Sequence, residues 1–213
     1  IDEPLGDIIR DEIMKQFPEI KREHIFLGAT HGHSCPANKF DDEDVEGRYR
    51  REFIGYIPQA AKLALEDVAP ATMEACKFQV PGMNFVRHYI MNDGSYAGDN
   101  FGDFSIGIED YATPVDPTMH LLKFTREGGK DVIVANWRAH PHYMGGSKKY
   151  VMSADYVSTF REALERQTDS HVAYFQGACG NVNSFTRIPS ESRTSDYRVG
   201  GALMADYAIE GLT

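Results

Sequence analysis

The segment HLLKFTREGGKDVIVANWRAHP, residues 120–141, decides the fold that we expect for this chain. Two apolar runs flank Glu127-Gly128-Gly129, and this arrangement is typical of a β-hairpin. The second run ends in His140-Pro141-His142, where two histidines stand one residue apart. Because helices and strands alternate elsewhere in the chain, the antiparallel hairpin predicts an α/β fold, with a mixed β-sheet layered with helices.

Helical periodicity marks further segments on both sides of the hairpin. Apolar residues recur at helical spacing before Pro18 and again over 49–68, where Pro58 should kink or split the helix. Ser153 is the expected N-cap of a helix that runs to about residue 167, and a last helix is expected over 194–210.

Strand patterns fill the intervals between these helices. Strands are predicted over 24–30, on both sides of Pro81-Gly82, and over 171–177. Residues 95–115 are rich in Gly and Asp and show little periodicity, so we expect a long loop there.

Composition narrows the class of protein and its partners. The chain has 213 residues, of which 42% are hydrophobic, so we expect one domain, 1–213, with a packed core. A net charge of −10 argues against binding to nucleic acid or to an anionic membrane. No apolar stretch is long enough for a transmembrane span. A small-molecule or lipid-like substrate is the expected partner, and the oligomeric state stays open.

The cysteines bear on the compartment. There are three of them and no CxxC pair, which argues against a disulfide scaffold and against a thiolate zinc site. Free thiols favour a reducing, cytoplasmic compartment, and the given sequence shows no signal-peptide pattern. Because the sequence begins at Ile1, a preceding segment and any signal within it stay open.

Two His-x-His elements follow predicted strands. His31 and His33 come after the strand expected over 24–30, and His140 and His142 come after the hairpin. Side chains at i and i+2 of an extended segment point the same way, and α/β proteins bind ligands beyond the carboxyl ends of strands. Zinc favours imidazole, and catalytic zinc sites have three protein ligands and an open position. We therefore expect one histidine of each pair to bind zinc, while the others contact substrate or carry protons.

Each of these features also has an ordinary structural explanation. His-x-His is a common string that also occurs where a strand enters a loop. Arg87 could serve in an ion pair, and Cys179 is expected to be a structural thiol and not a nucleophile.

Four short motifs, in order, are shared with a known family. They are Thr30-His31-Gly32-His33-Ser34-Cys35-Pro36, Asn84-Phe85-Val86-Arg87, Asn136-Trp137-Arg138-Ala139-His140-Pro141 followed by Ser153-Ala154-Asp155, and Gly180-Asn181-Val182-Asn183-Ser184-Phe185. Over most of residues 24–187 the chain resembles the N-terminal catalytic domain of the neutral/alkaline ceramidases and their bacterial relatives. The resemblance implies a ceramidase-like α/β fold.

The resemblance also implies a chemistry and roles for particular residues. It implies that His31 and His140 bind zinc, and that His33 and Arg87 face the reacting group. The implied reaction is hydrolysis of an N-acyl amide bond, in which zinc holds water and polarises the carbonyl. The chain is therefore expected to be a metal-dependent hydrolase of the amidase type, acting on C–N bonds.

Two departures from the family pattern change this expectation. The family's nucleophilic loop serine corresponds to Asn183, so we expect no ceramide hydrolysis, and Asn183 should bind an oxyanion or substrate instead. The family's remaining zinc ligands, a Glu and a Tyr, lie further downstream, and residues 188–213 contain no match. We therefore expect a fragment of a larger catalytic domain, or else a shortened member of the family whose site is weakened or lost. The third ligand stays open among His142, Asp155 and Asp103.

Two other functions are compatible with parts of this pattern. Strands ending in His-x-His also occur in barrel-shaped amidohydrolases, but such barrels need about 250 residues. A non-catalytic domain that binds carbohydrate or lipid and retains the ceramidase-like fold is the second alternative. The compartment stays open as well, since the family includes secreted members.

Overall fold

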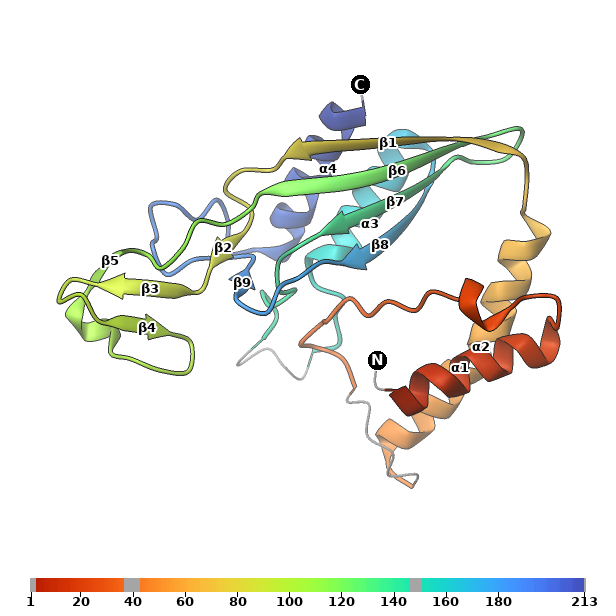
Figure 1. Ribbon diagram of the computed structural model, residues 1–213, viewed down its shortest axis with the longest axis horizontal. Helices are drawn as coiled ribbons and strands as arrows, with labels where there is room; N and C mark the ends of the chain where they lie inside the picture. The colour runs from red at the N-terminus through yellow and green to blue at the C-terminus, as the bar shows by residue number, and fades with distance from the viewer. Residues whose placement is uncertain (1–2, 37–42, 146–150, 213) are drawn as a thin grey trace.

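The computed structural model describes residues 3–36, 43–145 and 151–212 (Figure 1). Its centre is a four-stranded mixed sheet in the order β1-β6-β7-β8. The strands are β1 (Ala71–Gln79), β6 (Thr118–Arg126), β7 (Val132–Trp137) and β8 (His171–Gln176). The β6–β7 pair is the predicted antiparallel hairpin, and β8 lies parallel to β7. The predicted α/β class and mixed sheet are thus confirmed.

Two helices, α3 (Tyr156–Thr168) and α4 (Tyr197–Leu212), cover one face of this sheet (Figure 1). Alternate residues of β7 point into the core, where Trp137 packs with Tyr156 and Phe160 of α3. Gly201 lets α4 approach α3 closely, because a Cβ at this position would lie 2.7 Å from the Tyr156 carbonyl oxygen. No helix in the described parts of the chain is long and apolar enough to cross a bilayer.

The N-cap of α3 is Asp155 and not the predicted Ser153. Asp155 adopts φ 56°, and its carboxylate accepts from the backbone N–H of Tyr156 and of Met144. Ser153 lies two residues before this cap, and its hydroxyl accepts from the N–H of Asp155. The prediction was wrong because Ser and Asp are both good caps and stand two residues apart.

A second small sheet lies beside the first. Its strands, in the order β4-β3-β5, are β3 (His88–Met91), β4 (Tyr96–Gly98) and β5 (Ile108–Tyr111), with the 3₁₀ helix η2 (Phe104–Ile106) between them. The long loop expected over 95–115 is therefore wrong. These strands are too short to show an alternating pattern in the sequence, and they are stabilised by pairing with β3. A further two-stranded sheet joins β2 (Phe85–Val86) to β9 (Val182–Asn183).

The N-terminal part is a pair of helices, α1 (Glu3–Gln16) and α2 (Val45–Glu66), with the 3₁₀ helix η1 (Arg22–His24) after α1. Leu5, Ile9 and Ile13 form the core between them. Pro58 is buried inside α2, which continues through it, so the helix is not split. The proline costs a backbone hydrogen bond, and packing against α1 compensates for the loss.

The predicted strand over 24–30 is also wrong. Residues 25–30 form an extended segment that joins none of the described sheets, and Phe26 is 83% exposed. The apolar residues that suggested a buried strand, Ile25 and Leu27, pack against the α1–α2 core instead. These residues are buried by the helix pair. A short apolar run in the sequence does not show whether it packs against helices or within a sheet.

Candidate metal centre

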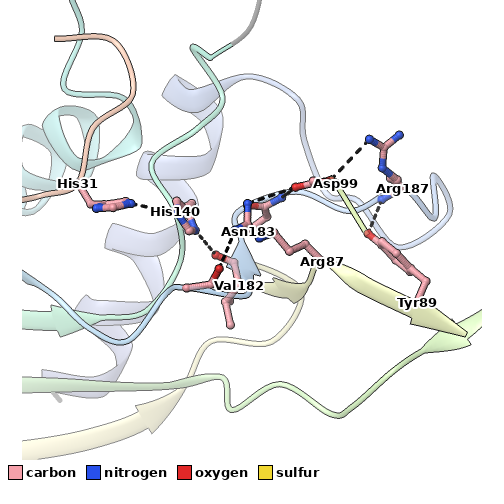
Figure 2. A network of polar contacts seen from close by, with 9 residues as sticks. His31, Arg87, Tyr89, Asp99, His140, Val182, Asn183 and Arg187 are labelled. Carbon is pink, nitrogen blue, oxygen red and sulfur yellow. Dashed lines mark hydrogen bonds and ion pairs between the residues drawn. The ribbon is translucent and has the colours of Figure 1, made fainter. Parts of the chain in front are cut away.

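Two histidines from distant segments meet beyond the carboxyl end of β7. The Nε2 atoms of His31 and His140 lie 3.1 Å apart although the residues are separated by 109 positions (Figure 2). One ring nitrogen each of His31, His33 and His140 fall within 4.8 Å of one another. Two ligands of a tetrahedral zinc, each 2.0–2.1 Å from the ion, lie about 3.3 Å apart. The 3.1 Å spacing of His31 and His140 therefore fits two ligands of one zinc ion, and imidazole is a donor that zinc favours. The 4.8 Å limit for the whole group is wider than this spacing.

His140 is held by the backbone of β9. The Val182 carbonyl accepts from the His140 backbone N–H at 2.8 Å and lies 3.1 Å from Nδ1. His140 is only 4% exposed, and it forms a parallel bridge with Asn183. A carbonyl accepts only, so Nδ1 must carry the proton, and the lone pair of Nε2 is left for a ligand.

His31 is presented by a strained turn. Its φ is 61°, in the left-handed region that a histidine seldom occupies. Three residues further on, Ser34 is buried and anchors the turn. Its hydroxyl donates to the Met144 carbonyl, and its own carbonyl accepts from the Ser153 N–H. Such strain persists where the surrounding contacts determine the conformation, and it is common at binding sites.

His142 joins the group as a fourth imidazole. Its ring centroid lies 4.4 Å from that of His33 and 6.5 Å from that of His140. Its Nδ1 is buried and has no hydrogen-bond partner among the described residues. Desolvation, followed by the neighbouring imidazoles, lowers the pKa of His33, and desolvation lowers the pKa of His140 as well. Both rings are therefore neutral at neutral pH, the form that binds metal.

The other two candidates for a third ligand serve elsewhere. Both carboxylate oxygens of Asp155 accept backbone N–H groups at the start of α3, where burial raises its pKa. Asp103 caps η2 by accepting from the Ser105 N–H. Of the alternatives left open by the sequence, His142 is the one that lies beside the imidazoles.

Arg87 and Asn183 lie next to the histidines and share one carboxylate. Asp99 Oδ2 is 3.4 Å from Nη1 of Arg87 and 3.2 Å from Nδ2 of Asn183, while its Oδ1 is 3.5 Å from Nη2 of Arg187 (Figure 2). Arg87 also donates to the Gly180 carbonyl, and its charge further lowers the pKa of His33 after the larger effects of burial and the imidazoles. Asp99 and Arg187 were not predicted from the sequence, and the acidic, glycine-rich composition of residues 95–115 was the one hint of Asp99.

Two potential nucleophiles lie near the histidine cluster, and neither is free to react. One is hydrogen-bonded and the other is protonated. The Ser184 hydroxyl is buried and donates to the His140 carbonyl at 3.0 Å. Cys179 is buried, and burial raises the pKa of its thiol. A protonated thiol is a poor nucleophile, in agreement with the structural role expected from the sequence.

The fold defines the chain as an α/β domain of the ceramidase-like type. No family model matches the chain, and no curated protein matches it. A solved structure described as a ceramidase complexed with C2 superimposes with a TM-score of 0.71 at 15% identity, over 98% of this chain and 33% of that one. Neutral ceramidase from Pseudomonas aeruginosa gives a TM-score of 0.66 at 14% identity, over 98% of this chain and 34% of that one.

These similarities confirm the predicted ceramidase-like fold, and at such identity they establish the fold alone. The chain spans about one third of the length of the two solved structures. The barrel alternative is wrong, because the described strands form open sheets with antiparallel pairs.

Proposed function

We propose that this protein is a metal-dependent hydrolase that cleaves an amide or related acyl bond, using zinc held by His31 and His140. The observation that carries the proposal is the 3.1 Å separation of their Nε2 atoms. A ring nitrogen of His33 lies within 4.8 Å of those of His31 and His140, and a catalytic zinc site has three protein ligands. Zinc would supply a Lewis acid and an activated water at this position.

The surrounding side chains supply the remaining chemistry. In hydrolysis the oxygen of water bonds to the acyl carbon, the C–N bond breaks, and a proton of the water passes to the departing nitrogen. His142, the imidazole outside the three-nitrogen group, carries that proton on a ring nitrogen. Arg87 and Asn183 bind the substrate beside the bond that breaks.

Metal content and turnover test the proposal together. The purified protein should bind one zinc per chain, and His31→Ala and His140→Ala should lose it. His120→Ala, which removes an exposed histidine of β6, is the matched control and should retain the metal. Release of amine from short N-acyl amides measures the reaction. Wild-type protein that binds no zinc would refute the proposal.

His33 has two possible roles that one variant separates. If His33 is a ligand, His33→Ala should weaken zinc binding strongly. If His33 faces the reacting group, as the resemblance implies, the variant should retain zinc and lose turnover.

A non-catalytic binding domain with the same fold is the second candidate. It is favoured by Asn183, which stands where the resemblance expects a serine, and by Ser184, whose hydroxyl is engaged. We propose that ceramide is not hydrolysed, for the same reason. Stoichiometric zinc without turnover of any N-acyl amide would favour this candidate, and release of fatty acid from ceramide would contradict the assignment of Asn183.

A further inference from the structure

The carboxylate of Asp99 is held by three donors, all at long range. The contacts to Arg87, Asn183 and Arg187 measure 3.4, 3.2 and 3.5 Å. Charge-assisted hydrogen bonds in proteins are about 2.7–2.9 Å long. Elsewhere in this chain Arg126 grips Asp67 in a bidentate pair at 2.7 and 3.0 Å. The three donors thus form a site for a carboxylate, and the carboxylate of Asp99 lies in this site at longer than ideal distances.

The site also has more positive than negative charge. Two guanidinium groups face one carboxylate, which leaves one positive charge uncompensated among these three side chains. This excess occurs in a protein whose net charge is −10. A second carboxylate, carried by a ligand, would be attracted to it.

Asn183 adds a hydrogen-bond acceptor to the same site. A carboxylate only accepts, so the atom of Asn183 that faces Asp99 must be Nδ2. Oδ1 is buried without a partner among the described residues, and the whole residue is 2% exposed. A buried, unpaired acceptor is costly, and a ligand N–H would satisfy it.

We propose that the substrate is an N-acyl amino acid, whose carboxylate takes the place of Asp99 between Arg87 and Arg187. This inference rests on the proposed hydrolase function and names the substrate class. Such a molecule carries an amide N–H and a carboxylate on the same carbon, which match the Asn183 acceptor and the arginines. Its hydrolysis consumes one water and yields a carboxylic acid and a free amino acid.

A hollow next to Arg187 fits the amino-acid side chain. It measures about 360 Å³ and is lined by Phe104, Ile108, Arg187, Ile188 and Pro189. Apart from the arginine these residues are apolar, so the site favours an amino acid such as leucine. Arg187 stacks over Phe104 at 4.3 Å, which keeps its guanidinium at the rim of the hollow.

The experiment compares N-acetyl-leucine with its neutral C-terminal amide, N-acetyl-leucinamide. We expect the acid to be hydrolysed with a kcat/KM at least about tenfold higher, the effect of one added charge-assisted hydrogen bond. Arg187→Ala should abolish this preference, and Arg187→Gln serves if the alanine variant does not fold. Arg166→Ala removes the same charge from an exposed position on α3 and should leave the preference unchanged. Equal rates for the two compounds would overturn the inference while leaving the hydrolase function intact.

Asp99→Asn separates exchange of carboxylates from a purely structural role. If Asp99 competes with the ligand, the variant should bind N-acetyl-leucine about tenfold more tightly, because the competing charge is removed. If Asp99 only supports the fold, binding should weaken, which contradicts the inference. Titration calorimetry of binding makes this test independent of turnover. Acid and amide binding with equal affinity would overturn the inference even if the protein hydrolyses neither.

Discussion

Charged and polar side chains lie at both ends of the β6–β7 hairpin, but they are paired more closely at one end than at the other. At the turn, Arg126 pairs with Asp67 through two short contacts, and its backbone N–H donates to Asp131. At the opposite end, the contacts of Asp99 are long, and buried atoms of His142 and Asn183 have no partner among the described residues. At the turn, Nε of Arg126 is also buried without a partner among the described residues, but both Nη atoms of that side chain are paired with Asp67. Native proteins pair nearly all buried polar groups, so the unpaired groups next to the histidines indicate a place kept for a ligand.

The largest effect is expected from His140→Ala, at the end of the hairpin opposite the turn. Loss of a metal ligand should reduce turnover by about a thousandfold or more, to the background of the binding site alone. The free energy of unfolding should fall by only about 1 kcal/mol, since one hydrogen bond to Val182 is lost. Zinc content, turnover and urea unfolding measure the three quantities. A turnover loss matched by an equal loss of folded protein would remove the difference between the two ends.

Asn183→Ala should have the next largest effect, also on function. We expect turnover to fall about tenfold to a hundredfold, the usual cost of removing a positioned amide from a reacting group. Stability should change by less than about 0.5 kcal/mol, because the one contact that this amide makes to Asp99 is long and its oxygen is unpaired. Steady-state kinetics and thermal unfolding on the same preparation check both.

At the turn the effect should be confined to stability. Gly129 has φ 72°, and a Cβ there would meet the side chain of Arg126, so Gly129→Ala should cost about 1–2 kcal/mol. Gly128 has φ 90°, but a Cβ there would have no neighbour within 4 Å, which makes Gly128→Ala the matched control for backbone strain alone. Urea unfolding should rank Gly129→Ala as the less stable of the two. The reverse order would mean that the Arg126 contact does not matter.

The smallest effect is expected from Arg126→Ala. The pair with Asp67 ties the turn to the end of α2. The Arg126 side chain is 9% exposed, but that of Asp67 is 52% exposed and its charge stays solvated, so the urea midpoint should fall only slightly. Zinc binding and turnover should be those of the wild type. Any loss of zinc in this variant would show that the two ends are coupled through the strands.

Local sequence was sufficient for the parts of the fold that depend on neighbouring residues. The hairpin, the helix before Pro18 and the strand at 171–177 follow from turn residues and periodicity, and all three are present. The placement of His31 beside His140 also agrees with the prediction, even though the strand expected before His31 is absent. That agreement came from the motif, because the route of residues 25–30 depends on helices packed far along the chain.

The part of the site that could not be predicted is non-local. Asp99 contacts Asn183 across 84 positions, and no pattern around either residue indicates the contact. The short strands β4 and β5 pair with β3 and so bring Asp99 to this position. Strands this short show no alternation of apolar and polar residues from which the pairing could be predicted. Arg187 follows a loop whose course is fixed by its backbone N–H bond to the Tyr89 hydroxyl.

The carbonyl of Val182 selects the nitrogen that His140 offers to an ion, and it does so with a main-chain atom. Any residue at position 182 carries the same oxygen, so substitutions there can alter the packing of β9 without changing the protonation pattern of the ring. The choice of the protonated nitrogen of His140 therefore does not depend on which side chain occupies position 182. Comparison of residue identities among related chains would not reveal it.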